Sequence, residues 1–123
     1  MSTSPKWSSP FRPSSFVHAF RGVYLFLTSE RHALLHSLAT LAVIAAGFFF
    51  HISEGEALAI TGMIGLVWTA EMFNTCIEKI MDFISRDRHP SIRFIKDVSA
   101  GAVLVASLAA FLTACFIFIP KII

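Results

Sequence analysis

Three long apolar stretches constrain the fold of this chain more than any other feature. They run through residues 33–52, 57–78 and 97–119. Each stretch is close to the ~20 residues that an α-helix needs to cross a hydrocarbon layer ~30 Å thick. Composition agrees, because 55% of the 123 residues are hydrophobic and the mean hydropathy is +0.71, too apolar for a soluble domain of this length. The sequence predicts an all-α integral membrane protein with three transmembrane helices.

The N-terminal part of the chain is different in character. Residues 1–14 are rich in Ser and Pro and predict a flexible leader. Over residues 15–29, apolar side chains such as Phe16 and Phe20 recur at helical spacing, which predicts an amphipathic helix lying on the membrane surface. Residues 15–123 then form one membrane domain. Three helices enclose little interior, so we expect a homo-oligomer that buries polar faces between subunits.

The distribution of basic residues predicts the orientation of the chain in the membrane. Nearly all Lys and Arg residues precede the first apolar stretch or lie between the second and third, whereas the connection over residues 51–56 has none. Lys121 alone follows the third stretch. Because cytoplasmic loops carry an excess of positive charge, we expect the N-terminus and the loop between the second and third helices to be cytoplasmic.

A ladder of polar residues stands at the cytoplasmic end of the second stretch. Its members are Glu71, Asn74, Glu78 and Asp82, at offsets of three, four and four residues. This spacing places four oxygen-bearing side chains on one face of a helix, an arrangement suited to a hard cation. An ionisable group at membrane depth costs ~2.5–3.5 kcal/mol on insertion scales, so the ladder predicts a functional site.

Two other functions would also use such a ladder. A small cation- or proton-coupled transporter places carboxylates inside an oligomer, but here the acids gather near one surface, with no second polar group at mid-membrane. A purely structural subunit could pair the acids with Lys79 or Lys96, but this leaves their shared face unexplained. The sequence has no phosphate-loop motif, zinc-ligand spacing or basic aromatic patch, so we expect no nucleic-acid partner.

Several motifs carry a resemblance to a known family. In chain order they are Ala19-Phe-Arg-Gly22 before Glu30, then the Glu71 to Asp82 ladder, then Lys96-Asp97-x-x-Ala-Gly-Ala-Val. From about Phe16 to Pro120 the chain resembles the prokaryotic diacylglycerol kinase family, small trimeric lipid kinases that include undecaprenol kinases. The resemblance implies a homotrimer in the bacterial inner (cytoplasmic) membrane. It also implies ATP-dependent phosphorylation of a lipid hydroxyl, at the cytoplasmic interface between adjacent subunits.

The resemblance further implies a role for each carboxylate. Glu30 and Glu78 are the candidate ligands of Mg²⁺, which neutralises the phosphates of ATP. Glu71 is the candidate catalytic base that accepts the proton of the lipid hydroxyl. It lies deepest in the apolar layer of the ladder residues, which agrees with contact to a lipid substrate.

The remaining candidate residues are those that the resemblance assigns to the nucleotide-binding site. Lys96 beside Asp97 is the candidate phosphate clamp, with a positive flank of the third helix as the alternative. The other positions that the resemblance assigns to the nucleotide site are Arg12, His18, Asn74, Asp82, Asp87 and His89. His18 could equally be an inert surface histidine. We interpret Arg86, Arg88 and Arg93 as solvated loop charges facing anionic lipid.

The resemblance implies that the lipid partner is a lipid alcohol, either undecaprenol or diacylglycerol. His36 and the Phe118–Lys121 ending are shared with the Gram-positive type of the family, which favours undecaprenol. The chain departs from many relatives at His32 and Leu34, where Asn and Arg are common. A missing Arg would weaken a contact to phosphate or lipid unless Arg31 or His32 replaces it.

Overall fold

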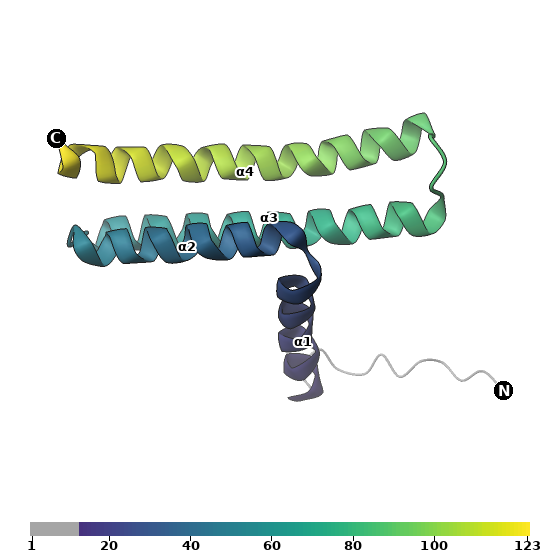
Figure 1. Ribbon diagram of the computed structural model, residues 1–123, viewed down its shortest axis with the longest axis horizontal. Helices are drawn as coiled ribbons and strands as arrows, with labels where there is room; N and C mark the ends of the chain where they lie inside the picture. The colour runs from purple at the N-terminus through teal and green to yellow at the C-terminus, as the bar shows by residue number, and fades with distance from the viewer. Residues whose placement is uncertain (1–12) are drawn as a thin grey trace. The chain divides into compact units, whose positions relative to one another are not determined.

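Four helices account for most of the chain. The computed structural model describes residues 13–123, and these form α1 (Pro13–Ser29), α2 (Arg31–Phe49), α3 (Glu54–Ile84) and α4 (Pro90–Ile122) (Figure 1). No strand occurs among these residues. The all-α prediction, with one shorter helix before three long ones, is confirmed. The chain forms two compact units that divide after Ser37, inside α2.

The first helix begins earlier than the sequence predicts. Residues 1–12 of the predicted leader lie outside the described residues, but positions 13 and 14 already belong to α1. Pro13 stands at the first helical position, where proline's fixed φ angle suits a helix and its missing N–H has no helical acceptor to lose.

The helices α2, α3 and α4 are each long and apolar enough to cross a membrane. Their bounds differ from the apolar stretches. α3 continues six residues beyond position 78, and α4 begins seven residues before position 97. With 31 and 33 residues, these helices are about 46 and 50 Å long, longer than a hydrocarbon layer of ~30 Å. Hydropathy finds only their apolar parts, whereas helical hydrogen bonding continues into the polar ends.

The turn from α2 to α3 is closed by a capping box. Ser53 Oγ accepts a hydrogen bond from the Glu56 backbone N–H at 3.2 Å, and Glu56 Oε1 accepts one from the Ser53 N–H at 3.0 Å. Just before this capping box, the backbone of His51 has a φ of 51° and the chain reverses its direction. The helix α2 ends at Phe49, three residues short of the predicted position 52. Lys121 Nζ lies 3.1 Å from Glu56 Oε1, joining the last turn of α4 to the first turn of α3.

Replacing Ser53 with alanine is expected to lower the free energy of unfolding by about 1 kcal/mol, since the cap satisfies an otherwise unpaired N–H group. Equilibrium unfolding in detergent micelles measures the loss. Ser107→Ala, in the middle of α4, is the matched control and should change stability less. Equal effects of the two substitutions would contradict a capping role.

Packing within residues 38–123 follows the antiparallel course of the long helices. α3 and α4 lie side by side along their lengths (Figure 1). Trp68 Nε1 on α3 donates to Thr40 Oγ1 on α2 at 2.9 Å. Few side chains are buried, however, and Phe48 and Phe116 are 79% and 78% exposed. Such extensive exposed apolar surface requires lipid or further subunits to cover it.

Candidate functional site

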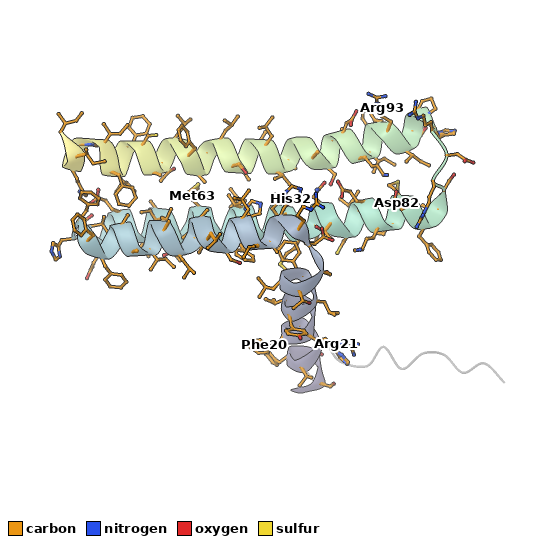
Figure 2. The ribbon with its side chains drawn as sticks, in the orientation of Figure 1. Phe20, Arg21, His32, Met63, Asp82 and Arg93 are labelled. Atoms are coloured by element: carbon orange, nitrogen blue, oxygen red, sulfur yellow. The ribbon has the colours of Figure 1, made fainter. Side chains whose placement is uncertain are left out.

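The candidate site lies where the polar ends of α3 and α4 meet. α3 carries no charged residue from Ala57 to Ala70 and becomes polar from Glu71 onward. α4 carries none from Val98 to Pro120, whereas Lys96 and Asp97 stand just before that stretch. Because the two helices are antiparallel and a short loop joins them, both polar ends lie at the same end of the pair (Figure 2).

The closest polar contact between these ends joins Lys96 to Asp82. Lys96 Nζ donates to Asp82 Oδ1 at 2.6 Å, and the two side chains are 36% and 49% exposed. Figure 2 shows Asp82 on the side of α3 that faces α4. The last acid of the ladder therefore holds the candidate phosphate clamp near α3. A purely structural role for the acids predicts ion pairs with Lys79 or Lys96, and the contact between Asp82 and Lys96 is one such pair.

Two consecutive hydrogen bonds connect the middle of the ladder to α4. Asn74 Nδ2 donates to Glu78 Oε1 at 3.4 Å, one helical turn along α3. Asn74 Oδ1 accepts from Ser99 Oγ on α4 at 2.7 Å. Glu71 is half-buried and Glu78 is exposed. Ser99 is not among the predicted site residues, although it stands three residues after Lys96 and so lies on the same side of α4.

A cavity of about 600 Å³ lies at the loop after α3 and the first turns of α4. Its walls contain the candidates Asp87, His89, Lys96 and Asp97, and also the three arginines interpreted above as solvated loop charges. The full lining is Arg86, Asp87, Arg88, His89, Pro90, Ile92, Arg93, Lys96 and Asp97. Four cationic side chains against two acidic ones give the walls a net positive charge, which attracts an anion such as a phosphate.

Ion pairing and helix capping shape this cavity. Arg93 Nε lies 3.7 Å from Asp97 Oδ2, and Figure 2 shows Arg93 on the side of α4 turned away from α3. His89 caps α4, because its Nδ1 accepts from the Ser91 N–H at 3.1 Å. In a neutral imidazole this leaves Nε2 as the donor. His89 can therefore hold the helix end and still offer an N–H group to a ligand.

The remaining candidates lie in the N-terminal unit. Glu30 joins α1 to α2; its N–H donates to the Phe26 carbonyl and its carbonyl accepts from the Ala33 N–H, each at 3.2 Å. His18 is exposed on α1, and Arg12 lies outside the described residues. Glu30 and Glu78 thus belong to different units, and the described residues bring together no group of three or more His, Cys, Asp or Glu able to hold a metal ion.

The donor chemistry at Glu78 nevertheless fits Mg²⁺. The side chain is exposed, and among residues 13–123 its one hydrogen bond, from Asn74 at 3.4 Å, leaves most of the acceptor capacity of its two oxygens for a cation. Carboxylate oxygens are the ligands that Mg²⁺ prefers, and it is usually bound by one or two of them together with substrate phosphates. Glu78 can supply one such carboxylate, one helical turn before Asp82, which contacts Lys96 in the wall of the cationic cavity.

Comparison with known proteins gives one consistent result. A family model described as prokaryotic diacylglycerol kinase matches residues 17–118. The chain is 37% identical over 108 residues to an undecaprenol kinase of Bacillus subtilis (strain 168), covering 88% of each chain. It is 31% identical over 110 residues to a diacylglycerol kinase of Synechocystis sp., covering 88% of this chain and 62% of that protein.

A diacylglycerol kinase of Pseudomonas aeruginosa is 30% identical to the chain over 93 residues, which are 76% of this chain and 70% of that protein. The region matched by the family model contains every candidate site residue except Arg12. The similarity therefore extends over α3, α4 and the loop between them, the segments that form the candidate site.

Proposed function

The chain belongs to the prokaryotic diacylglycerol kinase family and is a multi-pass membrane lipid kinase; from this premise we propose that it transfers the γ-phosphoryl group of Mg·ATP to a lipid hydroxyl at the cytoplasmic interface. The observation that carries the proposal is the meeting of a carboxylate ladder with a cationic cavity at one end of α3 and α4. A kinase needs both, since the nucleotide is anionic and its metal requires carboxylates.

The cationic cavity is the proposed nucleotide site. Lys96 lines it and stands closest to the ladder, through its contact with Asp82. Its ammonium can follow the β- and γ-phosphates as their charge redistributes during transfer. Arg86 and Arg88 add positive charge to the walls, and the His89 Nε2–H can donate to a phosphate oxygen.

Glu78 and Glu30 are the proposed ligands of Mg²⁺, with Asn74 supporting Glu78. When bound, the metal neutralises the phosphates. Each carboxylate contributes one formal negative charge toward the ion. Arg12 and His18 are proposed to cover the nucleotide from the N-terminal segment.

Glu71 is the proposed catalytic base. It is the first charged side chain after the apolar part of α3, which supports contact with the hydroxyl of a lipid alcohol. Its carboxylate accepts the hydroxyl proton as the lipid oxygen bonds to the γ-phosphorus, while the bond to the ADP oxygen breaks. The products are a lipid phosphate and ADP.

The lipid substrate is proposed to be undecaprenol, with diacylglycerol second. The undecaprenol kinase of Bacillus subtilis is 37% identical to this chain, against 31% for the diacylglycerol kinase of Synechocystis sp.. A panel of undecaprenol, diacylglycerol and ceramide in mixed micelles with labelled Mg·ATP tests this choice. We expect the fastest transfer to undecaprenol. Faster transfer to diacylglycerol would reverse the assignment and leave the kinase proposal intact.

We also propose a homotrimer in the bacterial inner membrane with a cytoplasmic N-terminus. The exposed apolar faces of α2 to α4 support further subunits, and the excess of basic residues before α2 and between α3 and α4 supports the orientation. A transporter remains the rival function, but a site confined to one end of the helices has no pathway to the other side.

Mixed oligomers test whether a site is shared between subunits. Glu30→Gln and Lys96→Met chains are each expected to be inactive alone. If Glu30 serves a neighbouring subunit's α3 and α4, co-assembly of equal amounts should restore roughly a quarter of wild-type activity, because each site then draws its two residues from different chains. Activity that stays at the level of the separate variants would place Glu30 and Lys96 of one site in the same chain.

A further inference from the structure

Ser99 is the only polar or charged residue that is buried within the described part of the chain, with 7% of its surface exposed. It lies on α4 at the start of the apolar stretch. Its hydroxyl donates across to Asn74 Oδ1 on α3 at 2.7 Å. The contact therefore joins the apolar part of α4 directly to the middle of the ladder.

This hydrogen bond differs from those that several other helical hydroxyls donate in the described part of the chain. Those hydroxyls bond back to the carbonyl four residues earlier in their own helix: Ser37 to Ala33, Thr61 to Ala57 and Thr113 to Ala109, each at 2.8 Å. Such back-bonding is the usual way in which Ser and Thr are satisfied inside a helix. A hydroxyl has one proton, and Ser99 donates its proton to a side chain of the neighbouring helix.

The bond fixes which way the Asn74 carboxamide faces. With Oδ1 accepting from Ser99, Nδ2 faces Glu78 Oε1 at 3.4 Å. The reversed carboxamide would place its oxygen against a carboxylate oxygen, so two acceptors would meet. Asn74 and Ser99 also line a cavity of about 410 Å³ between α3 and α4, and its other lining residues are apolar. No other side chain of that wall can replace the Ser99 hydroxyl.

We infer that Ser99 is a positioning residue of the phosphoryl-transfer site, which holds the Asn74 carboxamide so that its N–H group steadies the Glu78 carboxylate. The inference rests on the proposed function, in which Glu78 binds the metal. Groups that orient a metal ligand change metal affinity or activity by 10- to 100-fold when they are removed. Ser99 acts one contact further away, so the lower end of that range is expected.

Kinetics with three substitutions test the role. Ser99→Ala is expected to lower kcat about tenfold and to raise the Mg²⁺ concentration for half-maximal activity, with the KM for ATP changed less than twofold. Ser99→Thr keeps the hydroxyl and should retain most of kcat. Ser107→Ala, eight residues further along α4, is the matched control and should leave kcat unchanged. Binding of Mn²⁺ can be followed by its electron paramagnetic resonance in the absence of ATP and lipid. Of the three variants, only Ser99→Ala should bind Mn²⁺ more weakly than wild type.

A double-mutant cycle with Asn74→Ala separates positioning from a structural role. In the Asn74→Ala background, Ser99→Ala should lower kcat no further, because the hydroxyl acts only through that carboxamide. Unfolding free energies of the same four proteins measure the hydrogen bond without reference to activity, and they should also be non-additive. Should Ser99→Ala fail to assemble, Ser99→Cys takes its place in the cycle.

Three results would overturn the inference. An equal loss of kcat in both backgrounds would mean that Ser99 does not act through Asn74. If the unfolding free energies of the cycle are non-additive but Ser99→Ala leaves kcat and Mn²⁺ binding unchanged, the hydrogen bond has only a structural role. A wild-type protein that phosphorylates no lipid would remove the site that Ser99 serves; the unfolding cycle would still report the hydrogen bond, so this failure is distinct from the other two.

Discussion

Replacing Glu71 with glutamine is expected to lower kcat by 10²- to 10⁴-fold, the range for loss of a general base. Glutamine has nearly the same size and can still hydrogen-bond, but its amide does not accept the proton of the lipid hydroxyl. Glu71 is half-buried at the end of the apolar part of α3. Initial rates in mixed micelles measure the loss.

The matching control is Glu54→Gln, at the opposite end of the same helix. It removes one carboxylate from α3 and should leave kcat unchanged. Binding of a fluorescent ATP analogue should be similar in Glu71→Gln and wild type, since Glu71 does not touch the nucleotide in this account. A Glu71→Gln protein that retained more than a tenth of wild-type kcat would exclude Glu71 as the base.

Replacing Lys96 with methionine is expected to have the second-largest effect, a fall in kcat of about 10²- to 10³-fold, comparable to the loss of one donor that stabilises transition-state charge. Methionine fills the same space without the ammonium. The effect should appear mainly in kcat, because the other cationic side chains of the cavity still attract the nucleotide.

The substitution Asp82→Asn tests whether Lys96 acts on a phosphate of the nucleotide or through its ion pair with Asp82. It removes the ion pair at 2.6 Å but keeps the ammonium. If Lys96 acts on phosphate, Asp82→Asn should cost no more than about tenfold, far less than Lys96→Met. Equal losses would show that the ion pair between α3 and α4 is what matters, and would support the structural alternative for these two residues.

Much of the fold could be predicted because it follows from local patterns. The three long helices follow from the length of the apolar stretches, and the contact of Asn74 with Glu78 follows from their spacing of four residues. The early start of α4 left a signal that the sequence analysis did not use. His89 as the cap and Pro90 as the first helical residue are typical of a helix N-terminus.

The rest depends on contacts between segments, which periodicity does not determine. Whether Lys96 reaches Asp82, and Ser99 reaches Asn74, is set by the register of α4 against α3. Arg86 and Arg88, predicted to be solvated loop charges, are exposed, and the path of the loop also places them around the same cavity as Lys96, which their spacing in the sequence does not reveal. That Glu30 and Glu78 bind the same Mg²⁺ ion remains a prediction, because these residues lie in different units.

The most direct test of the central claim follows the γ-phosphate itself. Purified wild-type protein is incubated in mixed micelles with Mg²⁺, γ-labelled ATP and undecaprenol, and both the label in the extracted lipid and the ADP in the aqueous phase are measured. A lipid kinase predicts labelled lipid and ADP in equal amounts, with neither formed when the lipid alcohol is omitted. Release of inorganic phosphate without labelled lipid, or no turnover with any lipid alcohol, would contradict the account.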